Sequence, residues 1–437
     1  MDLKAPIPKY PRDFITSVIL ITLEIICGAL LLFGLYYMFQ PSWSENKLTA
    51  LQAELAAAKQ KGPEVEGTKP VSDNTSTQEV AINAVATETE SLKNEPTVTP
   101  TELPPTEEPT KEPTAEATKA TDASAFSPEL QAALKTVFAI LPTSAPRDKG
   151  QTPPPQLVEL GRMLYFDPRL SMSGTLSCND CHNLDTYGVD NLPLSLGISG
   201  SPVARNSPSV YNAAIHIAQF WDGRSPDVED QATKPIMAAG EMGMVDEAAV
   251  KANISAIEVY QNLFAEAFPE EKEPITLKNI GIAIGAFERG LLTPSRFDQF
   301  LGGKEEALNE QELRGLNTFV SLRCVTCHMG ASIGGTLYKK LGVIEPYETE
   351  DLGRFEITKA EEDKYVFKVP SLRNVAKTAP YLHDGSIATL EEMVPLMARH
   401  QLGKTVSDEQ VADIVAFLNT LTGELPAEYI EKPALPQ

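Results

Sequence analysis

The chain carries two copies of one short motif, CNDCH at residues 178–182 and CVTCH at residues 324–328. Each copy has two cysteines separated by two residues and a histidine directly after the second cysteine. This CxxCH pattern is the attachment signature of c-type haem: both thiols bond to the porphyrin and the histidine ligates the iron. The motifs therefore predict two covalently bound haem c groups. Their attachment residues are Cys178, Cys181 and His182 for the first, and Cys324, Cys327 and His328 for the second.

Two other uses of paired cysteines fit the sequence less well. A zinc site with four cysteines usually spaces its pairs by ~15–20 residues, whereas Cys181 and Cys324 lie 143 positions apart (324 − 181 = 143). A dithiol redox pair does not require the histidine that follows both motifs. The fifth cysteine, Cys27, lies alone in an apolar segment, so a fully paired disulfide framework is not expected.

The N-terminal part of the chain has the pattern of a membrane anchor followed by a tether. Residues 14–39 form a mostly apolar run with Glu24 as its only charge, long enough for a single transmembrane helix. Basic residues precede the run, so residues 1–13 are expected in the cytoplasm and everything after the run on the periplasmic side of the cytoplasmic membrane. Residues 40–125 begin as a short helical stalk and continue as a Thr-, Pro- and Glu-rich disordered spacer.

The rest of the chain shows a weak internal repeat built on helices. VELGRMLYF (158–166) precedes the first motif and QELRGLNTFVSL (311–322) the second, each with an apolar face, a glycine and an aromatic residue. Ser407 and Gln410 form a capping box at the start of a last helix, for which Gly423 is the expected end. Strand patterns are sparse. We therefore predict a mainly α protein with two cytochrome c-like haem domains, residues 126–300 and 301–437.

Three long strings in this part match a known family. They are CNDCHNLDTYGVDNLPLSLG (178–197), QFWDGRSPDVEDQATKPIMAAGEMGM (219–244) and FKVPSLRNVAKTAPYLHDGSIATLEEMVPLMARHQLG (367–403). From about residue 157 to residue 423 the chain resembles the bacterial dihaem cytochrome c peroxidases, which are related to the maturation enzyme of methylamine dehydrogenase. The resemblance implies an enzyme that reduces hydrogen peroxide to water with electrons from a small cytochrome c or another periplasmic donor.

The resemblance also implies unequal roles for the two haems. In the family the N-terminal haem is peroxidatic and the C-terminal haem receives electrons. A distal glutamate moves protons during cleavage of the peroxide bond, and Glu241 occupies that position. Gln231 and Pro235 match residues that line the same pocket, and Trp221 matches the tryptophan between the haems.

The sixth ligand of the second haem is expected from the C-terminal half. Met397 lies 14 residues after His383 (397 − 383 = 14), where the family places its axial methionine. Met393, one helical turn earlier, and His400 are competing candidates. A methionine–histidine pair raises the haem potential, as an electron-entry site requires. His216 is expected to be a packed or hydrogen-bonded histidine, because the family does not use that position as a ligand.

Two further features follow from the family pattern. Calcium lies between the domains in the family, and the matching positions here are Asn206, Thr378 and Pro380. Many members carry a histidine that caps the peroxidatic iron in the loop after the first haem. Here that loop reads SLGIS, with Ile198 at the histidine position. Since isoleucine cannot ligate iron, we predict a first haem that is open in the oxidised protein.

The remaining expectations concern partners and alternative functions. The net charge of −23 and the pI near 4.7 argue against nucleic acid as a partner. Soluble relatives are commonly dimers, so a homodimer is a candidate assembly. Two other functions stay open at this point, a dihaem oxidase acting on a protein or organic substrate and a non-enzymatic electron-transfer cytochrome.

Overall fold

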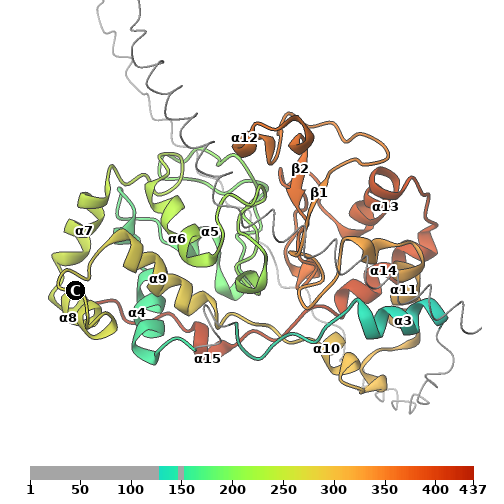
Figure 1. The fold of residues 1–437 in the computed structure, drawn as a ribbon, viewed down its shortest axis with the longest axis horizontal. Helices are drawn as coiled ribbons and strands as arrows, with labels where there is room; N and C mark the ends of the chain where they lie inside the picture. The colour runs from blue at the N-terminus through green and yellow to red at the C-terminus, as the bar shows by residue number, and fades with distance from the viewer. Residues whose placement is uncertain (1–126, 146–151) are drawn as a thin grey trace, which may run out of the picture. The chain divides into compact units, whose positions relative to one another are not determined.

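The computed structural model describes residues 127–145 and 152–437 (Figure 1). The transmembrane run, the stalk and the spacer predicted for residues 14–125 lie outside this part of the chain. None of the helices within the described ranges is both long enough and apolar enough to cross a membrane.

The described part is mainly helical, as the sequence predicts. Its sheet content is one antiparallel ribbon of β1 (Tyr338–Lys340) and β2 (Val366–Lys368), in which Lys339 pairs with Phe367. Short 3₁₀ turns connect the longer helices: η2 (Pro168–Leu170), η3 (Leu184–Thr186), η4 (Ala213–Ile215), η5 (Glu305–Ala307), η6 (Cys324–Thr326), η7 (Glu361–Asp363) and η8 (Val375–Lys377).

The first hydrophobic core surrounds the first motif. Fully buried side chains such as Leu160, Tyr165, Ile284 and Phe287 form it. Its helices are α4 (Pro155–Tyr165), α5 (Cys178–Cys181), α6 (Val228–Met237), α7 (Glu247–Ser255), α8 (Glu258–Ala267) and α9 (Leu277–Glu288).

The second hydrophobic core surrounds the second motif, with Leu316, Phe297 and Phe417 fully buried. Its helices are α3 (Pro128–Thr136), α10 (Arg296–Leu301), α11 (Glu310–Ser321), α13 (Leu390–Leu402) and α14 (Asp408–Asn419), and the short α12 (Phe355–Thr358) lies in the same half of the sequence. The N-terminal helix of the described chain packs in the second core, and its C-terminal helix packs in the first. In Figure 1, α3 lies beside α11, whereas Ile430 of α15 (Ala427–Ile430) belongs to the first core. The domain boundary at residues 300/301 stays a prediction.

One helix crossing is repeated in the two cores. A Cβ atom on Gly161 of α4 would lie 1.8 Å from the carbonyl oxygen of Ala283 in α9. A Cβ atom on Gly315 of α11 would lie at the same 1.8 Å from the carbonyl oxygen of Asp413 in α14. Since real side chains never approach a backbone oxygen this closely, only glycine allows either crossing. The glycines of the predicted repeat therefore mark where two helices touch backbone to backbone.

The last helix differs from expectation at its end. The capping box of Ser407 and Gln410 is present, but α14 ends at Asn419, with Thr420 as its C-cap, before Gly423. Gly423 has another role. A Cβ atom there would lie 2.1 Å from the carbonyl oxygen of Thr293, so this glycine permits close contact with the segment that joins the two cores.

Candidate haem centres and active site

The first CxxCH motif is held by the helix that precedes it. Cys178–Cys181 forms α5, and the Asp180 carboxylate accepts a hydrogen bond of 2.7 Å from the Ser177 backbone N–H. The buried Tyr165 of α4 donates its hydroxyl hydrogen to the carbonyl oxygen of His182 at 2.6 Å. The aromatic residue of the predicted repeat thus anchors the histidine of the motif.

Burial favours the neutral form of both motif histidines, the form in which imidazole ligates a metal. Burial lowers the pKa of His182 and lowers the pKa of His328 to about 4. The carbonyls of Pro208 and Pro370 lie beside the two rings and oppose this effect. Each buried Nδ1 atom nevertheless lacks a hydrogen-bond partner. A histidine that ligates a metal usually donates its other ring N–H to a carbonyl or carboxylate, and these two carbonyls are the candidate acceptors.

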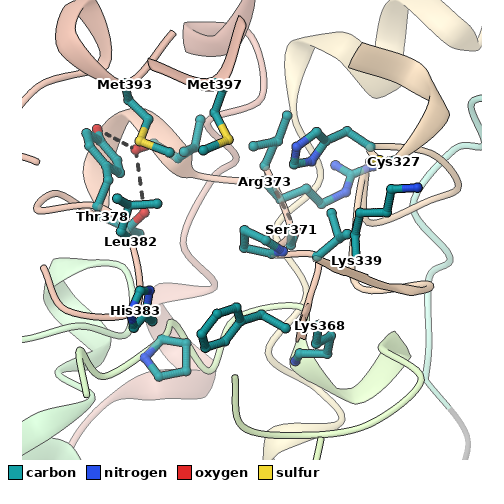
Figure 2. Close-up of a pocket in the computed structure, with 18 of the residues that line it drawn as sticks. Cys327, Lys339, Lys368, Ser371, Arg373, Thr378, Leu382, His383, Met393 and Met397 are labelled. Carbon is teal, nitrogen blue, oxygen red and sulfur yellow. Dashed lines mark hydrogen bonds between the residues drawn. The ribbon is translucent and has the colours of Figure 1, made fainter. Parts of the chain in front are cut away.

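A cavity of about 290 Å³ lies against the second motif and extends to residues of the first half (Figure 2). Its walls include Cys324, Cys327 and His328, together with many apolar and aromatic side chains. Among the described residues that line it none is Asp or Glu, whereas four carry a positive side chain: Arg323, Lys339, Lys368 and Arg373. The positive charge of this lining contrasts with the net charge of −23 for the whole chain. The lining fits a flat apolar group with carboxylates, as haem c is.

The two methionine candidates face this cavity together. Figure 2 shows the sulfur atoms of Met393 and Met397 pointing into it from α13. His400 is not among the lining residues, and its Nδ1 lies 2.8 Å from the carbonyl oxygen of Glu345. His383 lines the cavity, but its Nε2 lies 3.0 Å from the Thr349 hydroxyl. Met397 as the ligand stays a prediction, and the geometry leaves Met393 as its nearest competitor.

Glu241 lies in a turn directly after α6, next to the first motif. Burial raises the pKa of the Glu241 carboxyl, and the nearby Arg224 guanidinium opposes this effect. Burial is the main cause of the raised pKa of Cys181, and the Glu241 charge adds to it, so the carboxyl lies within electrostatic range of the motif. The Ile198 backbone N–H donates to the Glu241 carbonyl oxygen at 2.9 Å. The loop in which isoleucine replaces the family histidine therefore contacts the turn that carries the glutamate.

The helix before Glu241 is fixed by contacts that the sequence patterns did not reveal. Gln231 and Pro235 both lie on α6 and are partly buried. Glu229 of the same helix forms a buried ion pair with Arg289 at 2.7 Å. Gly285 of α9 leaves room for this side chain, because a Cβ atom there would lie 2.6 Å from Glu229 Cγ. Glu229 lies at the start of α6 and Arg289 directly after the end of α9, where charged residues are common. The sequence therefore did not indicate that the two side chains pair.

Trp221 connects the two halves of the molecule. Its indole N–H donates to the carbonyl oxygen of Asn206 at 2.9 Å, and its own carbonyl accepts from the Lys368 backbone N–H at 2.7 Å. Its ring meets the His383 ring edge-on, with 6.4 Å between centroids, and the His383 ring stacks on Phe367. Trp221 lines the cavity that also contains the second motif.

The three residues expected at a calcium site all line one cavity. Asn206, Thr378 and Pro380 line the same cavity, and the Asn206 backbone N–H donates to the His383 carbonyl at 2.8 Å. The Asn206 side-chain nitrogen donates to the carbonyl oxygens of Leu192 and Pro193. Calcium binding here stays a prediction.

Two buried charged groups were not anticipated. Lys368 on β2 is 7% exposed, and its Nζ lies 3.4 Å from Nδ1 of His216, the histidine expected to be packed or hydrogen-bonded. Glu288 on α9 is 4% exposed, and burial raises its pKa to about 8, with the Glu229 charge adding to the effect and Arg289 opposing it. Both lie in segments that look apolar in sequence, so only the tertiary fold shows their burial.

Comparison with known proteins agrees with this geometry. The family model for di-haem cytochrome c peroxidase matches residues 155–306. The cytochrome c551 peroxidase of Nitrosomonas europaea is 46% identical over 273 residues, which cover 62% of this chain and 81% of the relative. The cytochrome c551 peroxidase of Pseudomonas aeruginosa is 42% identical, covering 69% and 88%. The methylamine utilization protein MauG of Methylorubrum extorquens is 35% identical, covering 72% and 92%.

Solved structures show the same fold. A MauG-like protein associated with microbial copper homeostasis is 31% identical with a TM-score of 0.60, and the match covers 67% of this chain and 97% of that chain. The dihaem peroxidase BthA from Burkholderia thailandensis has a TM-score of 0.55 at 22% identity, covering 68% and 94%, which supports the fold alone. The chain therefore belongs to the dihaem cytochrome c peroxidase family, as an enzyme with two covalently bound haem c groups.

Proposed function

We propose that this protein is a membrane-anchored peroxidase in which the first haem centre reduces hydrogen peroxide and the second feeds it electrons from a small cytochrome c. The observation that carries the proposal is the position of Glu241, a partly buried carboxyl beside the first motif, in a turn that also contacts Ile198. Haem, when bound, supplies the iron at which the peroxide bond breaks and through which the electrons pass.

Glu241 would move the proton that makes this cleavage favourable. Hydroxide is a poor leaving group, so a carboxyl that takes a proton from one peroxide oxygen and delivers it to the other lets water leave instead. A carboxylate whose pKa has its ordinary value is a weak base and accepts a proton poorly near neutral pH. The raised pKa of Glu241 supports its use in both directions, and the Gln231 amide lies on the adjoining helix as a neutral hydrogen-bonding group.

The second centre would serve as the electron entry. Met397 is the proposed sixth ligand, and Trp221 is proposed to support transfer because it lies in the cavity of the second motif while belonging to the first half. Its two backbone and side-chain hydrogen bonds to Asn206 and Lys368 hold the indole in place.

Four finer features belong to the same proposal. Residues 14–39 would anchor the enzyme in the cytoplasmic membrane, and residues 40–125 would tether the body on the periplasmic side. A homodimer is the proposed assembly, and Asn206, Thr378 and Pro380 are the proposed calcium ligands. Membrane fractionation with protease accessibility tests the first two points, and light scattering with and without a calcium chelator tests the others.

Steady-state turnover of peroxide with reduced cytochrome c tests the function itself. We expect wild-type turnover, and a loss of ~10²–10⁴-fold in kcat for Glu241→Gln, because general acid–base catalysis contributes this much. The matched control is Glu247→Gln, an exposed glutamate in the first turn of α7, which should keep full activity. Haem content and the oxidised spectrum should be unchanged in both variants.

Three results would contradict the proposal. Glu241→Gln with full activity would exclude Glu241 as the proton carrier. Wild-type protein with two haems and no turnover would favour the oxidase reading. Electron exchange with cytochrome c but no peroxide consumption would favour a pure electron carrier.

A further inference from the structure

Lys368 is a buried cation without a buried anion to match it. It is 7% exposed, and among the residues that the structure describes no carboxylate lies within 4.0 Å of its Nζ. The nearest acidic influence is Asp222, but Arg205 and Arg224 already bind that carboxylate at 2.5 and 2.9 Å. Burying an ammonium is unfavourable unless a partner compensates its charge, so we expect a partner that the described residues do not supply.

His216 fixes where the ammonium points. Its Nδ1 lies 3.4 Å from Lys368 Nζ, so a neutral ring with its proton on Nε2 accepts a weak hydrogen bond from the lysine. Burial keeps the pKa of His216 far below its ordinary value, and the Lys368 charge lowers it further. A Cβ atom on Gly335 would lie 2.4 Å from the ring, so the imidazole is tightly held from the other side.

Both residues line the cavity of the second motif. That cavity has no acidic residue among its described lining, and Lys368 lies two positions before Pro370, whose carbonyl is beside the His328 ring. Figure 2 shows Lys368 at the same cavity as Cys327 and Met397. Burial lowers the pKa of Lys368 to about 8 in the absence of a partner, and a carboxylate within reach would raise it again.

We infer that the Lys368 ammonium, positioned by His216, binds a carboxylate inside this cavity, and that in the haem-loaded protein this carboxylate is a propionate of the second haem. The ion pair offsets a negative charge close to the iron. It therefore favours the reduced state and raises the midpoint potential of the electron-entry haem. The inference rests on haem binding and does not require peroxide turnover, so it can fail while the proposed function holds.

The test is a spectroelectrochemical titration of the full-length dihaem protein. Lys368→Met should lower the midpoint potential of the His328 haem and leave that of the His182 haem in place, whereas Lys368→Arg should restore it because the charge is kept. Lys339→Met is the matched control, since Lys339 lines the same cavity but is exposed and screened by solvent. Its shift should be much smaller.

Controls for folding, a second variant and an acetate titration keep the test decisive. Haem content and far-UV circular dichroism establish that each variant is folded. If Lys368→Met does not fold, His216→Leu is the second variant. It should lower the midpoint potential of the His328 haem by less than Lys368→Met would. Acetate, titrated at constant ionic strength, separates the sources of the carboxylate. If acetate leaves the midpoint potential of the His328 haem unchanged, the site is assigned to the propionate. If acetate lowers this potential saturably in the wild type but not in Lys368→Met, the site is assigned to a free carboxylate.

The inference is overturned if Lys368→Met and acetate both leave the two potentials unchanged. An equal shift in Lys339→Met, or a failure of Lys368→Arg to restore the wild-type value, would also overturn it, because either result would show that the position of the ammonium does not matter.

Discussion

The two haem lobes, each made of one hydrophobic core and its CxxCH motif, share one helix crossing and differ in the segments that lie near the motif. A Cβ atom added to Gly161 or to Gly315 would lie 1.8 Å from a carbonyl oxygen of the partner helix. Phe287 and Phe417 lie one turn beyond the contact in each case. In the first lobe a turn with Glu241 and a loop with Ile198 contact each other near the motif. In the second lobe, α13 presents two methionines to the cavity. The repeated crossing builds the haem site, and the loops and helices added to it make the sites unequal.

Changing the shared crossing should have the largest effect. Gly161→Ala and Gly315→Ala each place a methyl group 1.8 Å from a carbonyl oxygen, so one helix must shift. We expect a loss of about 3 kcal/mol or more in the free energy of unfolding, measured by thermal denaturation, together with reduced haem content in the affected lobe. Gly240→Ala is the control, because nothing lies within 4 Å of its added Cβ. Equal stability of Gly315→Ala and Gly240→Ala would refute the role of the crossing.

Removing the proposed sixth ligand should affect one lobe only. Met397→Leu keeps an apolar side chain of similar volume but removes the thioether, so the second haem should change from low spin to high spin in the oxidised protein. Electron paramagnetic resonance measures this change. Met393→Leu is the matched control on the same face of α13 and should keep the low-spin signal. The reverse result would assign the ligand to Met393.

A smaller effect concerns the pH dependence of stability, which the buried Glu288 adds to the first lobe alone. Burial raises the pKa of Glu288 in the first core to about 8, above the ordinary 4.5. Between these values the folded state holds a proton that the unfolded state has lost, so stability falls as pH rises, by ~1.4 kcal/mol per unit at most. Glu288→Gln cannot titrate and should flatten this fall when Tm is measured from pH 5 to 8. An unchanged slope would show that Glu288 is ionised in the folded protein.

Much of this organisation could be predicted from the sequence, because its signals are local. The CxxCH motifs, the helices around Gly161 and Gly315 and the capping box at Ser407 each depend on residues within a few positions of one another. Contacts between distant segments could not be predicted in this way. The Glu229–Arg289 pair joins residues 60 positions apart and the Lys368–His216 contact residues 152 apart, and neither has a spacing that marks it. The resemblance to a family assigned roles to positions, but not their burial.

The inequality of the lobes is tested most directly by mixing the fully oxidised dihaem protein with hydrogen peroxide in a stopped-flow spectrometer. Because Ile198 cannot ligate iron, the oxidised wild type should react at once, with a spectral change in the first haem alone. Ile198→His should slow or abolish this reaction until the second haem is reduced. If the oxidised wild type ignores peroxide and shows only low-spin haem, the first centre is closed and the two lobes are not divided as proposed.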